Sequence, residues 1–131
     1  MDYNKLAEIA IKSKQRALPT YSHFHVGAAL LTGEGKVYRG ANIENSSYSL
    51  TICAERTAVF NAVLEGEKNF KAIAVAGDSP GFTPPCGACR QVLLELCGPE
   101  LDVVLVDMEK NIKIYKLKEL IPHSFSKENL K

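Results

Sequence analysis

The spacing of hydrophobic and polar residues changes along the chain, and it predicts a series of helices and strands. Leu6, Ile9 and Ala10 recur at helical spacing, Asp2 precedes them as a helix cap, and Pro19 ends the run. Short apolar runs between turn residues predict strands. The predicted helices are 2–17, 53–64, 86–96 and 117–121, and the predicted strands are 26–32, 37–40, 72–76, 101–106 and 112–115. In the second helix one stripe is apolar and should face the core: Ala58, Val59, Ala62 and Val63.

The order of these elements predicts a single sheet with helices on both faces. The turn at 33–36 joins the first two strands as a hairpin, and helices separate the later strands. The polar segment 41–52 indicates a loop, and Gly66 and Gly98 end the second and third helices. We therefore expect an α/β fold, a three-layer α/β/α sandwich with a five-stranded mixed sheet, in one domain over residues 1–131.

Composition and charge limit the classes of protein to which this chain can belong. Hydrophobic residues make up 46% of the 131 residues and charged ones 24%, which is ordinary for a globular protein. The net charge is +1, and no basic stripe of the kind that binds nucleic acid is visible. No apolar run approaches the roughly 18 residues that span a bilayer, and the polar N-terminus does not resemble a signal peptide. We expect a cytoplasmic protein with neither a nucleic-acid nor a membrane partner, whose thiols stay reduced.

Three cysteines form the strongest chemical pattern in the chain. Cys53 opens one predicted helix, and Cys86 and Cys89 open another directly after two prolines. Zinc favours thiolate ligands, and a catalytic zinc site keeps one of four positions for water or substrate. Three thiolates at two helix N-termini, where backbone N–H groups are unpaired, therefore predict one zinc ion per chain with an open position.

The two residues after Ala54 complete this pattern. Glu55 lies within reach of a water at the open position and could carry protons as the catalytic residue. Three thiolates leave the zinc centre with a net negative charge, which weakens its Lewis acidity. Arg56 is the neighbouring cation, and we expect it to donate hydrogen bonds to one or two ligand sulfurs from outside the metal's own shell.

Other interpretations of the cysteines are open. A Cys-x-x-Cys pair beside a helix can be a redox motif, and a buried cysteine is often a small hydrophobic residue, which is how we interpret Cys97. The combination of Cys-x-Glu with Pro-Cys-x-x-Cys, however, is the known pattern of zinc deaminases. His23, His25 and His123 are left out of the site.

With these motifs the chain resembles the short, homotetrameric cytidine deaminases. The resemblance covers most of the length and is carried by residues 21–30, 40–45, 53–58 and 85–91. The Asn-Ile-Glu-Asn segment and the Tyr-Ser-His-Phe-His-Val-Gly segment are narrower than the zinc motifs and indicate a free nucleoside. The resemblance implies hydrolytic deamination of cytidine and 2′-deoxycytidine to uridine or 2′-deoxyuridine and ammonia, in pyrimidine salvage.

The resemblance also implies how the nucleoside is bound. It places Asn42 and Glu44 on the ribose, Phe24 in the wall of the pyrimidine pocket, and the backbone of Ala54 at the polar edge of the base. In the implied homotetramer, Tyr48 and Phe125 reach across subunit interfaces toward a neighbour's site, and Phe125 stacks on the base.

Three alternative functions share part of this sequence pattern. A deaminase of another small aminopyrimidine nucleoside would use the same zinc chemistry. A polynucleotide-editing deaminase would need to bind a charged strand, and the near-neutral charge argues against it. A zinc-stabilised binding module without catalysis would need a fourth protein ligand and would leave Glu55 without a purpose.

Overall fold

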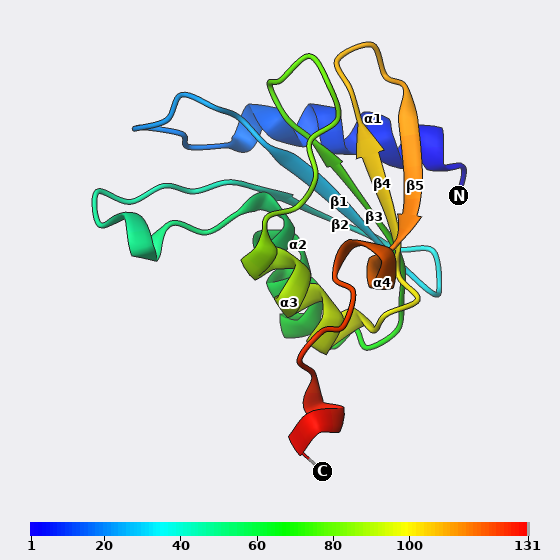
Figure 1. Cartoon of the computed structure of the whole chain (residues 1–131). Helices are drawn as coiled ribbons and strands as arrows, with labels where there is room; N and C mark the ends of the chain where they lie inside the picture. Colours follow the sequence, from blue (N-terminus) through cyan, green and yellow to red (C-terminus); the bar gives the residue numbers. More distant parts are fainter. Residues whose placement is uncertain (131) are drawn as a thin grey trace.

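A five-stranded sheet forms the centre of the structure, a computed structural model that describes residues 1–130 (Figure 1). The strand order is β2-β1-β3-β4-β5. The β3 and β4 pair is parallel and the other neighbouring pairs are antiparallel, so the sheet is mixed. The strands are β1 (Gly27–Thr32), β2 (Val37–Ala41), β3 (Phe70–Ala76), β4 (Asp102–Val106) and β5 (Ile112–Lys116).

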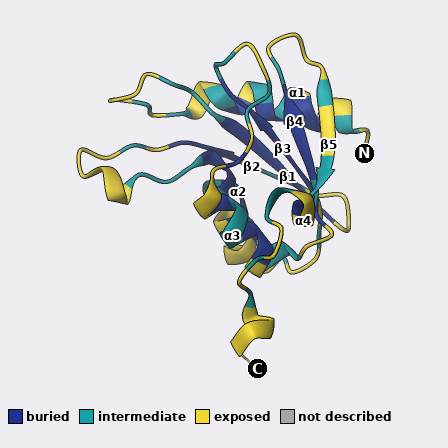
Figure 2. Cartoon of the chain, in the orientation of Figure 1, coloured by how far each residue is buried: buried dark blue, intermediate teal, exposed yellow. Residues whose placement is uncertain are grey.

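Helices cover both faces of this sheet, which confirms the predicted three-layer fold. They are α1 (Tyr3–Ser13), α2 (Ala54–Leu64), α3 (Gly87–Cys97) and the short α4 (Leu117–Leu120). Successive residues of a strand point to opposite faces. In β1, Leu30 therefore packs with α2 and α3, whereas Leu31 packs with α1. The central strand β1 is accordingly buried along its whole length, and β3 and β4 are buried after their first one or two residues (Figure 2).

The helix boundaries follow the predicted signals with small differences. The side chain of Asp2 accepts a hydrogen bond from the Asn4 N–H and caps α1. The helix ends earlier than predicted, at Ser13, and continues as a 3-10 turn over Lys14–Arg16. Gly66 and Gly98 adopt positive φ angles of 93° and 87°, which explains why glycine ends these two helices.

The outer face of α2 differs from the prediction. Ala58, Val59 and Ala62 are buried, but Val63 is exposed, so its expected place in the core is wrong. Phe60 and Leu64 are exposed beside it, and α2 therefore presents apolar side chains to solvent as well as to the sheet.

Two loops and the chain end project from this body. The segments 18–26 and 42–53 run side by side, joined by an isolated bridge between Leu18 and Ile43 (Figure 1). A second bridge, between Ile43 and Ile52, connects the two ends of the 42–53 loop. The tail after α4 extends away from the sheet to a 3-10 turn at Lys127–Leu130. Within residues 1–130, no helix has the length and apolar character needed to cross a membrane.

Candidate metal centre and substrate cavity

The three predicted ligands meet at the N-termini of α2 and α3. The Sγ atoms of Cys53, Cys86 and Cys89 all lie within 4.8 Å of one another, and those of Cys53 and Cys86 are 3.7 Å apart. A tetrahedral zinc ion with Zn–S bonds of about 2.3 Å spaces its sulfurs by about 3.8 Å. The thiol triad therefore fits zinc, and no fourth side-chain ligand belongs to this cluster within residues 1–130.

The N-terminal residues of α2 and α3 determine where these thiols lie. Cys53 and Cys86 are the N-cap residues of α2 and α3, with extended backbones, and neither side chain caps its own helix. Their sulfurs are thus free to bind a metal while the first-turn N–H groups add positive potential. Arg90 fixes the backbone just before Cys86, because its guanidinium donates to the carbonyls of Pro85 (2.8 Å) and Leu120 (2.6 Å).

Glu55 lies in the first turn of α2 and is only 3% exposed. Burial raises the pKa of this carboxyl to about 7, and the negative charge at Cys53 adds to the rise. The pKa of Cys53 moves the other way, to about 5, because a hydrogen bond from Cys89 outweighs burial and Arg56 adds its positive charge. The centre thus combines a thiolate with a carboxyl group that can hold or release a proton near neutral pH.

Arg56 contacts the centre from outside the thiol triad. Its Nη2 lies 3.4 Å from the Cys53 sulfur and 3.5 Å from the carbonyl oxygen of Thr51. Its Nε is buried and has no hydrogen-bond partner within the described structure. This geometry places a fixed positive charge beside one ligand sulfur.

A cavity of about 320 Å³ opens directly onto the metal centre. This volume falls within the roughly 300–1,000 Å³ typical of small-molecule sites. It brings together the predicted residues Phe24, Asn42, Glu44, Cys53, Ala54, Glu55 and Cys86. Its other lining residues, not predicted from sequence, are Ser22, Val26, Thr51, Thr83 and Pro84. The position of Thr83 and Pro84 just before a metal ligand could have indicated their part in the wall.

The side chains of Asn42 and Glu44 already bond to the protein. Asn42 accepts from the Val26 N–H at 2.9 Å and donates to the Phe24 carbonyl at 2.8 Å. Glu44 accepts from the backbone N–H groups at 21 and 22 and from the Ser22 hydroxyl. Both side chains therefore shape the cavity wall, and their predicted contact with ribose would use their remaining hydrogen-bonding capacity.

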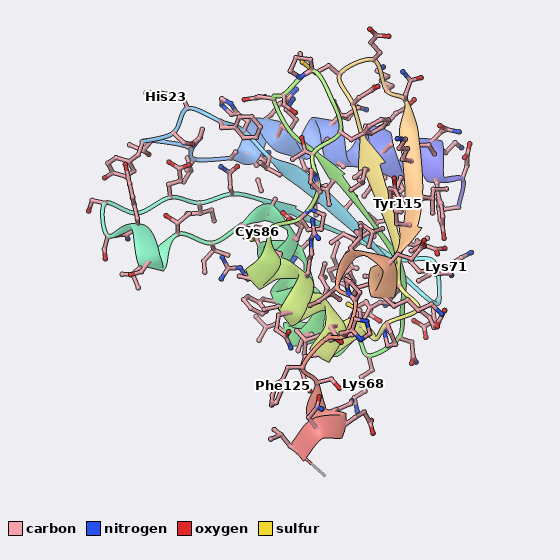
Figure 3. The ribbon with its side chains drawn as sticks, in the orientation of Figure 1. His23, Lys68, Lys71, Cys86, Tyr115 and Phe125 are labelled. Carbon is pink, nitrogen blue, oxygen red and sulfur yellow. The ribbon has the colours of Figure 1, made fainter. Side chains whose placement is uncertain are left out.

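Tyr48 and Phe125 lie outside the cavity. Tyr48 is 71% exposed at the tip of the 42–53 loop and packs edge-on against Tyr21, with ring centroids 5.7 Å apart. Phe125 is 63% exposed on the tail, well separated from Cys86 at the start of α3 (Figure 3). The tail is attached to α3 by a hydrogen bond from Gln91 to the Phe125 carbonyl. Neither ring therefore meets the cavity of its own chain.

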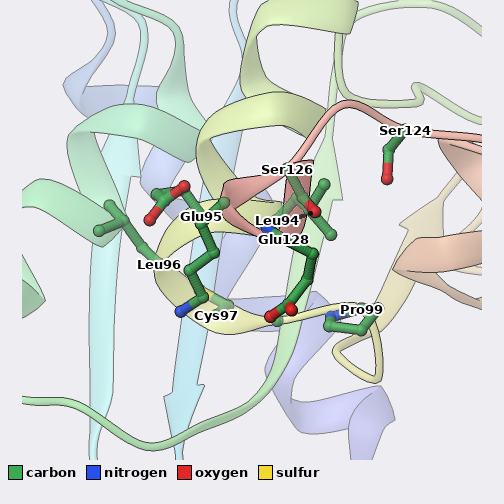
Figure 4. Close-up of a pocket in the computed structure, with 10 residues that line it drawn as sticks. Leu94, Glu95, Leu96, Cys97, Pro99, Ser124, Ser126 and Glu128 are labelled. Carbon is green, nitrogen blue, oxygen red and sulfur yellow. Dashed lines mark hydrogen bonds between the residues drawn. The ribbon is translucent and has the colours of Figure 1, made fainter. Parts of the chain in front are cut away.

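A second cavity, of about 440 Å³, lies between the C-terminal end of α3 and the tail (Figure 4). Cys97 lines it, and burial raises the pKa of this thiol to about 12. The cavity shares no residue with the metal centre. The predicted structural role of Cys97 agrees with its distance from the thiol triad.

Comparisons with known proteins agree with this geometry. The family described as "Cytidine and deoxycytidylate deaminase zinc-binding region" matches residues 1–105. The cytidine deaminase of Sporosarcina psychrophila is 48% identical over 99% of this chain and 96% of its own length. The cytidine deaminase of Mycobacterium tuberculosis is 38% identical, over 99% of this chain and 94% of its own.

A solved structure supports the same conclusion. The crystal structure of cytidine deaminase from Burkholderia pseudomallei superimposes with a TM-score of 0.92 and 46% identity. The alignment covers 95% of this chain and 100% of that one. The thiol triad, the buried glutamate and the shared fold thus agree with the sequence comparisons, and the chain belongs to the zinc-dependent cytidine deaminase family.

Proposed function

We propose that this chain, as a single catalytic domain, hydrolyses the amino group of cytidine to give uridine and ammonia. The observation that carries the proposal is the buried Glu55 beside the three zinc-binding thiols, at the wall of a cavity of nucleoside size. The same cavity would accept 2′-deoxycytidine, since the base reacts and the sugar is only held. The reaction suits a pyrimidine salvage route, in which free nucleosides are the substrates.

Cys53, Cys86 and Cys89 would hold the zinc ion. When bound, zinc supplies a Lewis acid that lowers the pKa of water toward neutrality. Glu55 accepts a proton from the attacking water and delivers it to N3 of the cytosine ring, which makes C4 more electrophilic. Glu55 then transfers the remaining proton of that water, from the hydroxyl now on C4, to the amino group. The C4–N bond breaks, ammonia leaves, and C4 becomes a carbonyl carbon of uridine. Its burial supports this role, because a desolvated carboxyl can exist in both protonation states near neutral pH.

The cavity wall supports the predicted binding of the nucleoside. Phe24 offers an apolar surface to the pyrimidine, and the backbone of Ala54 lies at the same wall as Glu55. Asn42 and Glu44 lie together on the loop side, where an amide and a carboxylate suit sugar hydroxyls. In this proposal Ser22 and Thr51 add hydroxyl groups on the same side.

Exposed apolar residues support the proposed homotetramer. Phe60, Val63 and Leu64 on α2 form an uncovered apolar surface. Tyr48 and Phe125 are exposed aromatic residues on projecting segments, which suits contact with a neighbouring subunit's cavity. Light scattering on the zinc-loaded protein measures this directly, and a monomer would contradict it.

The cysteines also support a cytoplasmic location. All four, including Cys53, are free thiols in the structure. Zinc binding requires these thiols reduced, which the cytoplasm maintains.

The experiment that tests the function is loss of the cytosine ultraviolet absorbance when the zinc-loaded protein is mixed with cytidine. We expect conversion to uridine by the wild type, and a loss of turnover by several orders of magnitude in Glu55→Gln at unchanged zinc content. No turnover by the wild type would refute the proposed substrate. Normal turnover by Glu55→Gln would refute the proton-carrying role.

A further inference from the structure

Asp78, two residues after β3, joins three segments that meet beside the substrate cavity. Its Oδ2 accepts from both the backbone N–H (2.7 Å) and the ring Nδ1 (2.8 Å) of His25. Its Oδ1 pairs with Lys14 Nζ at 3.0 Å, and the same Nζ donates to the Gly77 carbonyl at 3.0 Å. One carboxylate thus connects the end of α1, the segment leading into β1 and the loop between β3 and α3.

The partners of Asp78 lie directly behind the cavity wall. His25 is the neighbour in sequence of Phe24 and Val26, which both line the cavity. The carbonyl of Phe24 and the N–H of Val26 are held by Asn42, so Asp78 anchors the one N–H between them. The backbone of this wall is therefore fixed from two sides, by Asn42 within the cavity and by Asp78 behind it.

The loop that follows Asp78 packs against the same wall. A Cβ added to Gly77 would lie 2.4 Å from Oγ1 of Thr83 and 3.1 Å from Cε1 of Phe24. Thr83 and Phe24 thus meet over Gly77, where only a residue without a side chain fits. The loop continues through Pro84 to the zinc ligand Cys86. The positions of the base-binding wall and of one metal ligand are therefore linked through this short segment.

We propose that Asp78 is a positioning residue, which holds the Phe24 wall of the cavity against the loop that leads to Cys86. Asp78 does not line the cavity itself and acts through His25 and Lys14. The inference rests on the proposed function, because it assigns Phe24 to the pyrimidine. A wall that binds the base equally in the ground state and in the transition state changes KM more than kcat when it loosens.

The test compares Asp78→Ala and Asp78→Asn with the wild type. Asparagine keeps one oxygen that can accept from the His25 N–H, whereas alanine keeps none. We expect KM for cytidine to rise about tenfold in Asp78→Ala and less in Asp78→Asn, with kcat within about twofold, since small displacements in a binding site cost up to about 100-fold. Zinc content should stay at one ion per chain, because the three thiols are carried by the N-termini of α2 and α3, and Arg90 holds the Pro85 carbonyl just before Cys86.

Asp107→Ala is the matched control for Asp78→Ala. Asp107 follows β4 as Asp78 follows β3, and it also accepts from backbone N–H groups, at Glu109 (2.9 Å) and Asn111 (2.8 Å). Neither partner lines the cavity. This variant should lose a comparable set of hydrogen bonds without a change in KM.

Hydrogen exchange at the His25 amide measures the anchoring without turnover, and protection should fall in Asp78→Ala. Unchanged protection would overturn the inference whatever the activity. An unchanged KM, or a loss of kcat that follows a loss of zinc, would overturn it as well. Failure of the wild type to convert cytidine would instead refute the proposed function, while the exchange result still decides the anchoring.

Discussion

Gly40 in β2 and Ala54 in α2 are in backbone contact: a Cβ added to Gly40 would lie 2.1 Å from the Ala54 carbonyl oxygen. The same atom would lie 2.6 Å from the Ala58 N–H nitrogen. The first turn of α2, with Glu55 in it, therefore rests directly on the edge strand of the sheet. Because no side chain fits between them, the height of Cys53 and Glu55 above the sheet is set by this contact.

Gly40→Ala should consequently separate β2 from α2. We expect the free energy of unfolding to fall by about 1–3 kcal/mol, the usual cost of overpacking, together with weaker zinc binding. Urea denaturation and a chelator competition measure the two effects. Gly33→Ala is the control, because its Cβ would meet nothing closer than 3.6 Å. Equal stability of the two variants would contradict the proposed contact.

Removal of single thiols should distinguish the metal ligands from Cys97, because only the loss of a ligand lowers zinc affinity. We expect Cys86→Ser to lower zinc affinity by more than about 100-fold, since loss of an outer partner alone costs 10–100-fold. Cys97→Ala should keep its zinc, because Cys97 lies at the far end of α3, outside the thiol cluster. Metal analysis after dialysis against a chelator gives the comparison. Stoichiometric zinc in Cys86→Ser would exclude it as a ligand.

Arg56→Ala should lower the activity of the metal centre without removing a metal ligand. The guanidinium lies 3.4 Å from the Cys53 sulfur, so its loss leaves more negative charge on the thiolates. We expect kcat/KM for cytidine to fall by about 10–100-fold, the usual cost of losing such a partner. Arg56→Lys should recover part of this loss through its positive charge. Full turnover by the alanine variant would show that Arg56 does not tune the metal.

Phe125→Ala should affect activity more than stability. The ring is 63% exposed, so its removal uncovers little of the core. If it stacks on the base in a neighbouring subunit, KM should rise several-fold, since stacking on an aromatic ring is worth about 1–3 kcal/mol per base. Leu130→Ala, also in the tail and 77% exposed, is the control. Similar kinetics of both variants would argue against the stacking role.

Acid should remove the stabilising contribution of Asp78. Burial opposes ionisation of Asp78, but the hydrogen bonds from His25 and the pairing with Lys14 outweigh it and lower the pKa from 3.8 to about 2. A group whose pKa is lower in the folded chain stabilises it above pH 3.8 and loses that contribution as pH falls toward 2. The wild type should therefore exceed Asp78→Asn in unfolding free energy at neutral pH, by a margin that shrinks across this range. A constant margin in urea titrations would contradict the pairing.

Much of the fold could be predicted because its signals are local. The short apolar runs of the strands and the glycine stops at Gly66 and Gly98 each depend on a few neighbouring residues. Val63 shows where periodicity ends: helical spacing defines a stripe, but packing decides which side of that stripe meets the sheet.

The residues of the candidate site likewise differ in whether the sequence alone identifies them. Cys53, Cys86 and Cys89 could be recognised because each stands at the start of a helix in a motif with few alternatives. Asp78 gave no such signal, since its partners His25 and Lys14 lie more than 50 residues away in sequence. A single polar residue in a loop is ordinary until the fold brings its partners to it.

The sequence by itself determined the elements and the thiol ligands, and it predicted Glu55 as the proton carrier, because hydrophobic spacing, helix starts and metal preference depend on short segments. Only the tertiary structure decided the order of the strands, the contact between α2 and Gly40, and the cavity wall whose backbone Asn42 and Asp78 hold by hydrogen bonds. These features depend on distances between residues far apart in the chain. Such distances follow from how the layers pack, and local patterns do not encode them.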